Sequence, residues 1–209
     1  MFEGLDPTKT AHIVVDLQNG FMAEGATVEV PTAREIVPNV NAISKALRAA
    51  GGLVVYIRFI TDKAGWSTWY THFNRGQRLD DVVAAFTPGN EQFELWAGLD
   101  VQPEDLIVDK TRFGAFVPGS SELDAILKAR GIDTLIITGT ATNVCCESTA
   151  RDAMQMNYKV IFVADGNAAM TDVEHATTLN NMAALFADVM TADELVGVLS
   201  AAPKMQAAE

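Results

Sequence analysis

The sequence has few of the residues that build disulfide frameworks or metal centres. Its 209 residues include only two cysteines, Cys145 and Cys146, and three histidines. Adjacent cysteines cannot supply a disulfide framework, because a bridge between chain neighbours is strained and no other cysteine is present to pair. Two free thiols indicate a reducing compartment, so we expect a cytoplasmic protein.

Positive charge is also scarce. The chain has 15 Lys and Arg against 27 Asp and Glu, which gives a formal net charge of -12. Binding nucleic acid through its phosphates requires a basic surface, so we expect no nucleic-acid partner. No apolar run approaches the ~18 residues of a membrane span, and we expect no membrane partner. The N-terminal segment MFEGLDPTKT lacks the apolar core of a signal peptide.

Short β-branched runs alternate with longer amphipathic stretches, which is typical of βαβ units and a parallel sheet. Strands are predicted at 11–17, 53–60, 106–110, 134–138, 159–165 and 188–191. Helices are predicted at 39–50, 120–130 and 172–186. Two more are predicted, one directly after the cysteine pair and one that ends at about residue 199. The pattern predicts a single α/β domain over residues 1–209, in which 61–105 is an excursion from the sheet and 200–209 is a frayed tail.

Polar residues and glycines give the expected ends of these helices. Gly51 and Gly52 should end the first helix. Ser120 or Ser121 should cap the start of the second.

Three chemically active side chains are expected at one edge of the sheet. Asp16 ends the first strand, Lys110 ends the third, and the fourth opens into the segment GTATNVCC with Cys145. Ligands of open parallel sheets bind beyond the carboxyl ends of the strands. Each residue alone has a simpler explanation, as a turn cap, a solvated charge or a packing thiol. Their coincidence at three strand ends predicts a catalytic site.

The two cysteines are predicted to face different ways. With Thr142 or Asn143 as the helix N-cap, Cys146 begins a small-residue stripe at i, i+4 and i+7 that suits packing on a sheet. Cys146 should therefore be inert. Cys145 points about 100° away, in the first turn, where free N–H groups and the helix dipole favour a thiolate. The same N–H groups suit an oxyanion.

Three segments together resemble the isochorismatase-like cysteine hydrolase superfamily, which includes nicotinamidases, N-carbamoylsarcosine amidohydrolase and ureidoacrylate amidohydrolase. The segments are IVVDLQNGF with Asp16, DKTRFGAF with Lys110, and GTATNVCCESTARDA with Cys145. They occur in the family's order, and the similarity extends over roughly residues 10–190. The ureidoacrylate type is the most similar around the second and third segments.

The resemblance implies a three-layer α/β/α, Rossmann-like fold around a six-stranded parallel sheet. The sequence does not fix the order of the strands in that sheet. It assigns the nucleophile to Cys145, with Asp16 as the base and Lys110 beside the thiolate. It implies a non-proline cis peptide before Ala141, and an oxyanion hole formed by the N–H groups of Ala141 and Cys145. It also implies no cofactor, a small-molecule substrate, and a homodimer or homotetramer.

The substrate is less clear. Nicotinamidases carry an Asp-x-His…His metal site after the second strand, where this chain has only His72. His12 and His175 are far away in sequence, so we predict no metal site and keep a nicotinamidase-like amidase as an alternative. True isochorismatases lack the cysteine, so Cys145 favours hydrolysis of a C–N bond in an amide, ureido or carbamoyl group. Phe113 stands where the ureidoacrylate type has a tyrosine.

Two proteins of other classes were considered. A nucleotide-binding module is disfavoured, because no G-x-G-x-x-G or G-x-x-x-x-G-K segment follows a strand. A catalytically inactive family member acting as a binding protein stays possible, although the set of Asp16, Lys110 and Cys145 is intact.

Aromatic residues recur with helical spacing in the excursion. Trp66, Trp69, Tyr70 and Phe73 either pack a short helix onto the body or a neighbouring subunit, or form a wall over a small planar substrate. The predicted substrate-binding residues are Asn19, Phe21, Trp66, Trp69, Tyr70 and Phe113. Arg75, Arg78 and Arg112 are candidates for holding a substrate carboxylate, with a salt bridge or a solvated charge as the alternative.

Overall fold

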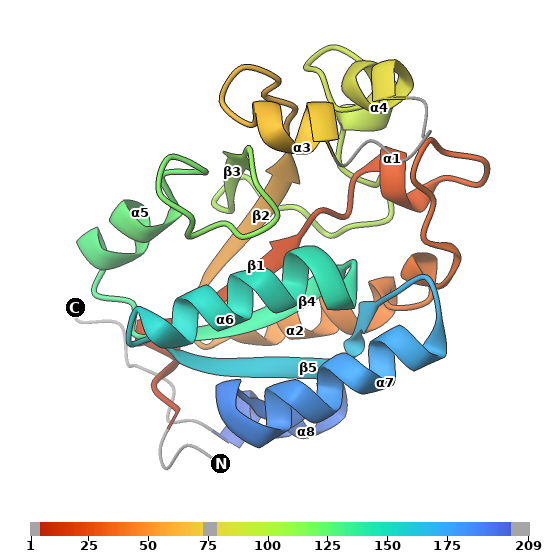
Figure 1. The fold of residues 1–209 in the computed structure, drawn as a ribbon. Helices are drawn as coiled ribbons and strands as arrows, with labels where there is room; N and C mark the ends of the chain where they lie inside the picture. Colours follow the sequence, from red (N-terminus) through yellow and green to blue (C-terminus); the bar gives the residue numbers. More distant parts are fainter. Residues whose placement is uncertain (1–4, 73–78, 202–209) are drawn as a thin grey trace.

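The computed structural model describes residues 5–72 and 79–201, so Phe73, Arg75 and Arg78 lie outside the described residues. Within them, the strands form one parallel sheet in the order β3-β2-β1-β4-β5-β6 (Figure 1). They are β1 (Thr10–Val15), β2 (Leu53–Phe59), β3 (Leu106–Lys110), β4 (Thr134–Thr140), β5 (Lys159–Ala168) and β6 (Asp188–Met190). The predicted strands and the parallel sheet are confirmed.

Helices cover both faces of the sheet, which confirms the three-layer fold. On one face, α2 (Val37–Ala49) and α8 (Ala192–Ala201) pack side chains such as Ile43 and Leu195 against Ile136 and Ile161 of the sheet. On the other face lie α5 (Leu123–Ala129), α6 (Glu147–Gln155) and α7 (Asp172–Asn181). Figure 1 shows α6 in front of the sheet and α2 behind it.

Strand β1 lies at the centre of the sheet and is buried along its whole length. Its side chains alternate between the two cores, because successive residues of a strand point to opposite faces. Ala11, Ile13 and Val15 belong to the core under α5 and α6, while Val14 belongs to the core under α2. A strand that is buried on both faces reads as a nearly continuous apolar run, which is why β1 is legible in the sequence.

The helix ends follow the expected chemistry only in part. Gly51 follows α2 with a φ of 87°, a conformation that suits glycine. Helix α5 begins at Leu123 with Glu122 as its N-cap, so the predicted caps are one or two residues too early. The Ser121 hydroxyl still accepts a hydrogen bond from the Leu123 N–H, whereas the Ser120 hydroxyl donates to the Gly114 carbonyl.

The segment after β4 begins differently from the prediction. Its N-cap is Ala141, and Thr142–Cys146 forms a π-helical turn that continues into α6. Thr142 does not cap the helix, because it is buried and its hydroxyl lies 2.9 Å from Nδ1 of His175. Helix α7 is likewise shorter than predicted, since residues Met182–Phe186 form a second π-helical turn.

The excursion 61–105 covers the carboxyl ends of the central strands. It contains α3 (Ser67–His72), α4 (Leu79–Ala85) and a 3₁₀ turn at Glu91–Phe93. Together with α1 (Asn19–Met22), α3 and α4 lie above the strand tips in Figure 1. A small core of Phe59, Val82 and Phe86 joins this cap to β2.

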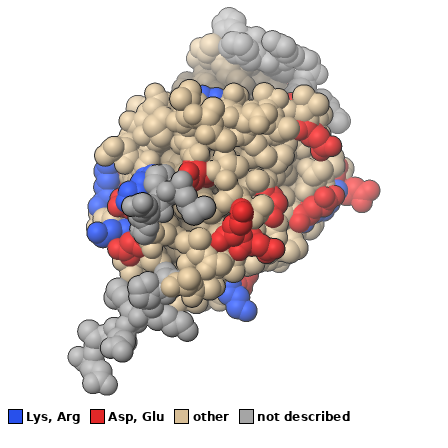
Figure 2. All heavy atoms as spheres, turned by 90° about the horizontal axis from the view of Figure 1, so that it is seen from below, with Lys and Arg blue, Asp and Glu red and all other residues tan. Residues whose placement is uncertain are grey.

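The surface carries the expected excess of acidic groups. Figure 2 shows one face with many Asp and Glu side chains and few Lys and Arg. Among the described helices, none has the length and apolar character needed to cross a bilayer.

Candidate active site

The carboxyl edge of the sheet brings Asp16 and Lys110 into direct contact. Asp16 follows β1 and Lys110 ends β3, with β2 between them. The Lys110 Nζ lies 2.7 Å from Oδ2 of Asp16 and 5.2 Å from the ring centroid of Phe59, at the end of β2. Both charged side chains are fully buried. Burial of an ion pair requires good geometry and further hydrogen bonds, and Nζ also donates to the Arg112 carbonyl at 3.1 Å.

Gln18 holds the strand ends around this pair. Its amide nitrogen donates to the carbonyl oxygens of Phe59 and Phe93, and its amide oxygen accepts from the Phe59 N–H at 2.7 Å. Asp16 has a φ of 55°, and its own N–H donates to the Ile57 carbonyl at 3.0 Å. Gln18 was not among the predicted site residues, although it lies within the IVVDLQNGF segment.

The carboxyl end of β4 requires a glycine at position 139. Gly139 has a φ of 124°, and a Cβ at this position would collide with the Val15 carbonyl of the neighbouring strand. The peptide bond between Thr140 and Ala141 is cis, as the family resemblance implied.

The two cysteines have the different surroundings that were predicted. Cys146 is fully buried in the core with Ala150 and Ala153 of α6, which confirms the small-residue stripe. Cys145 lies in the first helical turn, is 5% exposed, and lines a cavity at the carboxyl edge of the sheet.

The prediction of an ionised Cys145 is wrong for the resting protein. Burial raises the pKa of the Cys145 thiol well above its usual value, Lys110 opposes this increase, and the Asp16 carboxylate adds to it. The sequence indicates a helix start but not the depth of burial, and desolvation here exceeds the effect of the ammonium. The structure therefore favours a neutral thiol beside a charged pair.

The pKa values of Asp16 and Lys110 are shifted as well. Burial raises the pKa of Asp16, and Lys110 reduces this increase. Burial acts to lower the pKa of Lys110, but Asp16 and Cys145 outweigh it and the net pKa is raised. Lys110 therefore stays an ammonium that fixes one oxygen of Asp16.

The other oxygen of Asp16 is not satisfied. Oδ1 is buried and has no partner of normal hydrogen-bond geometry among the described residues, although the Cys145 thiol lies close enough to the Asp16 carboxylate to affect its pKa. Buried polar atoms without partners are rare in folded proteins, and they call for an explanation. An unpaired carboxylate oxygen near a thiol is suited to accept a proton from it.

A cavity of about 340 Å³ opens beside Cys145. This is near the lower end of the range for small-molecule sites, roughly 300–1,000 Å³. Of the predicted site residues, Phe21, Trp69, Phe113, Ala141 and Cys145 line it. Whether they bind substrate stays a prediction.

Asn19, Trp66 and Tyr70 are not among the lining residues. The Asn19 amide donates to the Glu91 carbonyl at 2.9 Å, so it holds the excursion in place. Trp66 stacks on Trp69 at 5.0 Å between ring centroids and meets Phe113 edge to face at 4.9 Å. The aromatic segment packs onto the body through Trp66, and Trp69 lines the cavity, while its contact with a substrate stays a prediction.

Arg112 takes the structural role. It lies 3.5 Å from the Asp62 carboxylate, donates to the Thr111 and Gly65 carbonyls, and stands over the Trp66 ring. Its guanidinium is thus already occupied by partners within the protein.

Sequence reasoning missed several cavity residues. Phe59 ends β2 at the carboxyl edge, so the position of the strand end could have identified it. Asn143 also lines the cavity, and its place two residues before Cys145 could have identified it. Phe86, Met170 and Glu174 line it too, and only the tertiary fold brings them there. His175, which is distant from this segment in the sequence, contacts Thr142 in the turn that carries Cys145.

His12 is structural, since its two ring nitrogens hydrogen-bond with Ser44 at 2.9 Å and Thr138 at 2.8 Å. In the part of the chain whose side chains are described, no group of three or more His, Cys, Asp or Glu is arranged to hold a metal ion.

Comparison with known proteins gives a consistent result. The isochorismatase domain model matches residues 10–194. Ureidoacrylate amidohydrolase RutB of Agrobacterium fabrum is 31% identical over 95% of this chain and 93% of its own length. A cysteine hydrolase structure from Pseudomonas syringae pv. phaseolicola has a TM-score of 0.84 and 31% identity, covering 95% of this chain and 96% of that one.

N-carbamoylsarcosine amidase from Thermoplasma acidophilum is a further structural neighbour. It has a TM-score of 0.72 and 25% identity, covering 88% of this chain and 97% of that one. The domain match includes all three segments that carry Asp16, Lys110 and Cys145. The chain therefore belongs to the isochorismatase family.

Proposed function

We propose that this protein is a cysteine-dependent amidohydrolase that cleaves the C–N bond of a small amide, ureido or carbamoyl substrate. The observation that carries the proposal is the unpaired Oδ1 of Asp16, buried beside a cavity-lining thiol and next to Lys110. The names of the relatives, a ureidoacrylate amidohydrolase and an N-carbamoylsarcosine amidase, support the same reaction class.

In the first half of the reaction, Oδ1 of Asp16 accepts the Cys145 proton as Sγ attacks the substrate carbonyl carbon. Lys110 stabilises the sulfur's developing charge. The N–H groups of Ala141 and Cys145 hold the oxyanion of the tetrahedral intermediate. Asp16 then returns the proton to the nitrogen, the C–N bond breaks, and ammonia or an amine leaves a thioester on Cys145.

In the second half, Asp16 takes a proton from water, and the hydroxide attacks the thioester carbonyl. The C–S bond breaks, the acid product leaves, and the proton returns to the Cys145 sulfur. The raised pKa of Asp16 suits this role, because a base is most effective when its pKa lies near the working pH. The thiol then needs to ionise only when a substrate carbonyl is in place.

The other candidates have less support. A nicotinamidase structure from Staphylococcus aureus is 21% identical, which supports the shared fold alone. An inactive binding protein would have no need of an unpaired carboxylate oxygen beside the thiol. A cytoplasmic location and a homodimer or homotetramer stay predictions.

The test is an ammonia-release screen over small amides, ureides and carbamoyl acids, with two matched variants. We expect Cys145→Ala to lose at least ~10³-fold in kcat/KM, because no covalent intermediate can form. Cys146→Ala, which removes the neighbouring sulfur, should stay within a few-fold of the wild type. Intact mass spectrometry should find an acyl adduct on the wild type and on Cys146→Ala. Full activity of Cys145→Ala would refute the mechanism.

A further inference from the structure

The wall of the cavity beside Cys145 is almost entirely apolar. Its aromatic and aliphatic lining residues are Phe21, Val28, Val30, Phe59, Trp69, Val82, Phe86, Phe113, Ala141, Val144 and Met170. Apart from Cys145, the polar lining side chains are Asn143 and Glu174. Among the described lining residues there is no lysine or arginine, so the cavity's fixed charge comes from a carboxylate.

We propose that the non-reacting part of the substrate is apolar and carries no negative charge, so the protein prefers uncharged or cationic amides to carboxylate-bearing ones. This proposal rests on the proposed function, since it concerns what Cys145 attacks. It separates the chain from its ureidoacrylate-hydrolysing relatives, whose named substrate is an acid.

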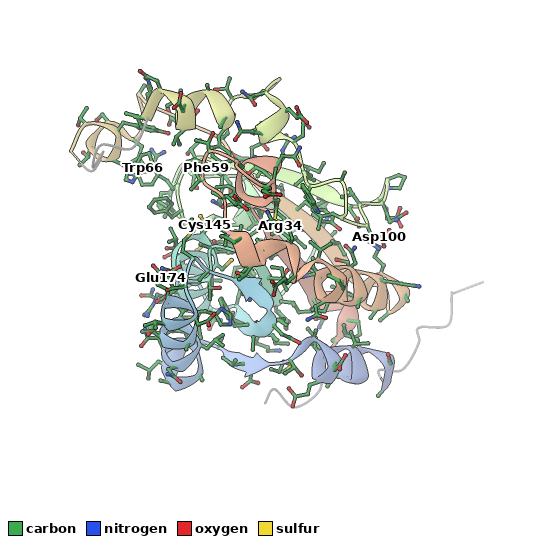
Figure 3. All side chains as sticks on the ribbon, turned by 90° about the vertical axis from the view of Figure 1, so that its right-hand side faces the viewer. Arg34, Phe59, Trp66, Asp100, Cys145 and Glu174 are labelled. Atoms are coloured by element: carbon green, nitrogen blue, oxygen red, sulfur yellow. The ribbon has the colours of Figure 1, made fainter. Side chains whose placement is uncertain are left out.

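Glu174 is held in place at the cavity. It lies in the first turn of α7, where Thr171 is the N-cap and accepts a hydrogen bond from the Glu174 N–H. The Thr171 hydroxyl also donates to Oε2 of Glu174 at 2.9 Å, so one side-chain hydrogen bond orients the carboxylate. Figure 3 shows Glu174 on the same side of the molecule as Cys145. A carboxylate held at the cavity disfavours an anionic substrate by like-charge repulsion.

The described cations do not compensate for this charge, whereas Arg75 and Arg78 lie outside the described residues. Lys110 is fully buried, is paired with Asp16, and is not a lining residue. Arg112 is occupied by Asp62 and by carbonyl groups. Arg58 pairs with Asp109 at 2.8 Å and stands over the Phe93 ring. A substrate carboxylate would therefore lose hydration without gaining a described cationic partner.

Asn143 supplies the polar contact that a neutral amide needs. It lies two residues before Cys145, and its Oδ1 is buried without a hydrogen-bond partner. An unpaired amide oxygen beside the nucleophile can accept the N–H of the scissile amide or ureido group. The cavity then recognises the reacting group through Asn143 and the rest of the molecule through apolar contact.

The experiment compares three amides of equal length: hexanamide, ω-aminohexanamide and adipic acid monoamide. We expect kcat/KM for the neutral and cationic amides to exceed that for the anionic amide by at least ~10-fold, which corresponds to about 1.4 kcal/mol. Binding is measured independently as protection of Cys145 from alkylation, followed by intact mass. We expect the neutral and cationic amides to protect Cys145 better than the anionic amide does, whether or not each amide is hydrolysed.

Two variants with the same change in charge test the role of Glu174. Glu174→Gln keeps a side-chain oxygen that can accept the hydrogen bond from the Thr171 hydroxyl, and it should reduce the discrimination against adipic acid monoamide about tenfold. Glu104→Gln removes an exposed carboxylate just before β3, at the opposite edge of the sheet, and should leave the discrimination unchanged.

The outcomes separate this proposal from the proposed function. Cys145-dependent hydrolysis that prefers adipic acid monoamide would overturn the charge preference and leave the mechanism intact. Failure of both uncharged and cationic amides to protect Cys145 would also overturn it, because an apolar cavity must accept an apolar chain. Hydrolysis that persists in Cys145→Ala would instead refute the mechanism.

Discussion

Two buried polar clusters lie near each other along the chain and differ in how completely they are satisfied. The histidine cluster consists of His12, Ser44 and Thr138, and both ring nitrogens of His12 have partners. The proposed catalytic cluster consists of Asp16, Lys110 and Cys145, in which Oδ1 of Asp16 has none.

The difference shows what each cluster does. A buried polar group with all its hydrogen bonds stabilises one packed arrangement, and it offers nothing to a ligand. A buried charge with an unpaired oxygen beside a cavity has capacity left for a reacting molecule. Only the second cluster reaches the carboxyl edge of the sheet, where the cavity opens. Changes in the first should therefore affect stability, and changes in the second should affect activity.

The largest effect is expected for Asp16→Asn. Removing the proton acceptor should lower kcat/KM by about 10²–10⁴-fold. In the wild type, activity should fall as the pH drops through the raised pKa of Asp16, because the protonated acid cannot act as a base. His12→Gln is the matched control and should keep activity within a few-fold. An Asp16→Asn variant with more than a tenth of the wild-type rate would contradict this assignment.

Lys110→Met should destabilise the fold by about 3–5 kcal/mol, because it leaves a buried carboxylate without its partner. Urea unfolding gives the change in free energy. The double variant Asp16→Asn/Lys110→Met removes both charges and should recover most of the loss. If the double variant is no more stable than Lys110→Met, the ion pair is not the source of the effect.

The histidine cluster should control stability in acid. Burial lowers the pKa of His12 to about 3, whereas an unfolded histidine has a pKa of about 6.5. The contribution of neutral His12 to the free energy of unfolding is therefore complete above pH ~6.5. It is lost as the pH falls towards 3, at about 1.4 kcal/mol per pH unit. Between pH 7 and 5, the wild type should lose about 2 kcal/mol more than His12→Gln, as measured by urea unfolding. Equal losses would show that His12 does not titrate in this way.

The smallest effect is expected for Ser44→Ala. This change leaves one nitrogen of the His12 ring without its partner, at a cost of about 1–2 kcal/mol. Ser200→Ala, at an exposed position of α8, should change the free energy of unfolding by less than ~0.5 kcal/mol. Thermal and urea unfolding of both variants measure the difference. Equal stability of the two would mean that the Ser44 hydroxyl is not needed in the cluster.

The fold was largely predictable because its strands are buried on both faces and stand out as apolar runs. β1 illustrates this, since its sequence and its burial pattern agree along its length. Helix starts were less predictable, as α5 and the turn before α6 show. Thr142 has the side chain of a typical N-cap, but its hydroxyl contacts His175, which lies 33 residues later in the sequence on α7. Local sequence does not contain that contact.

The sequence alone determined the sheet, the positions of Asp16, Lys110 and Cys145 at its carboxyl edge, and the inert packing of Cys146. These follow from periodicity and strand ends, which are local properties of the chain. Only the tertiary structure decided the protonation of Cys145 and the composition of the cavity. A pKa depends on burial and on charges from several elements, and the wall that includes Phe86, Met170 and Glu174 comes from segments that folding brings together.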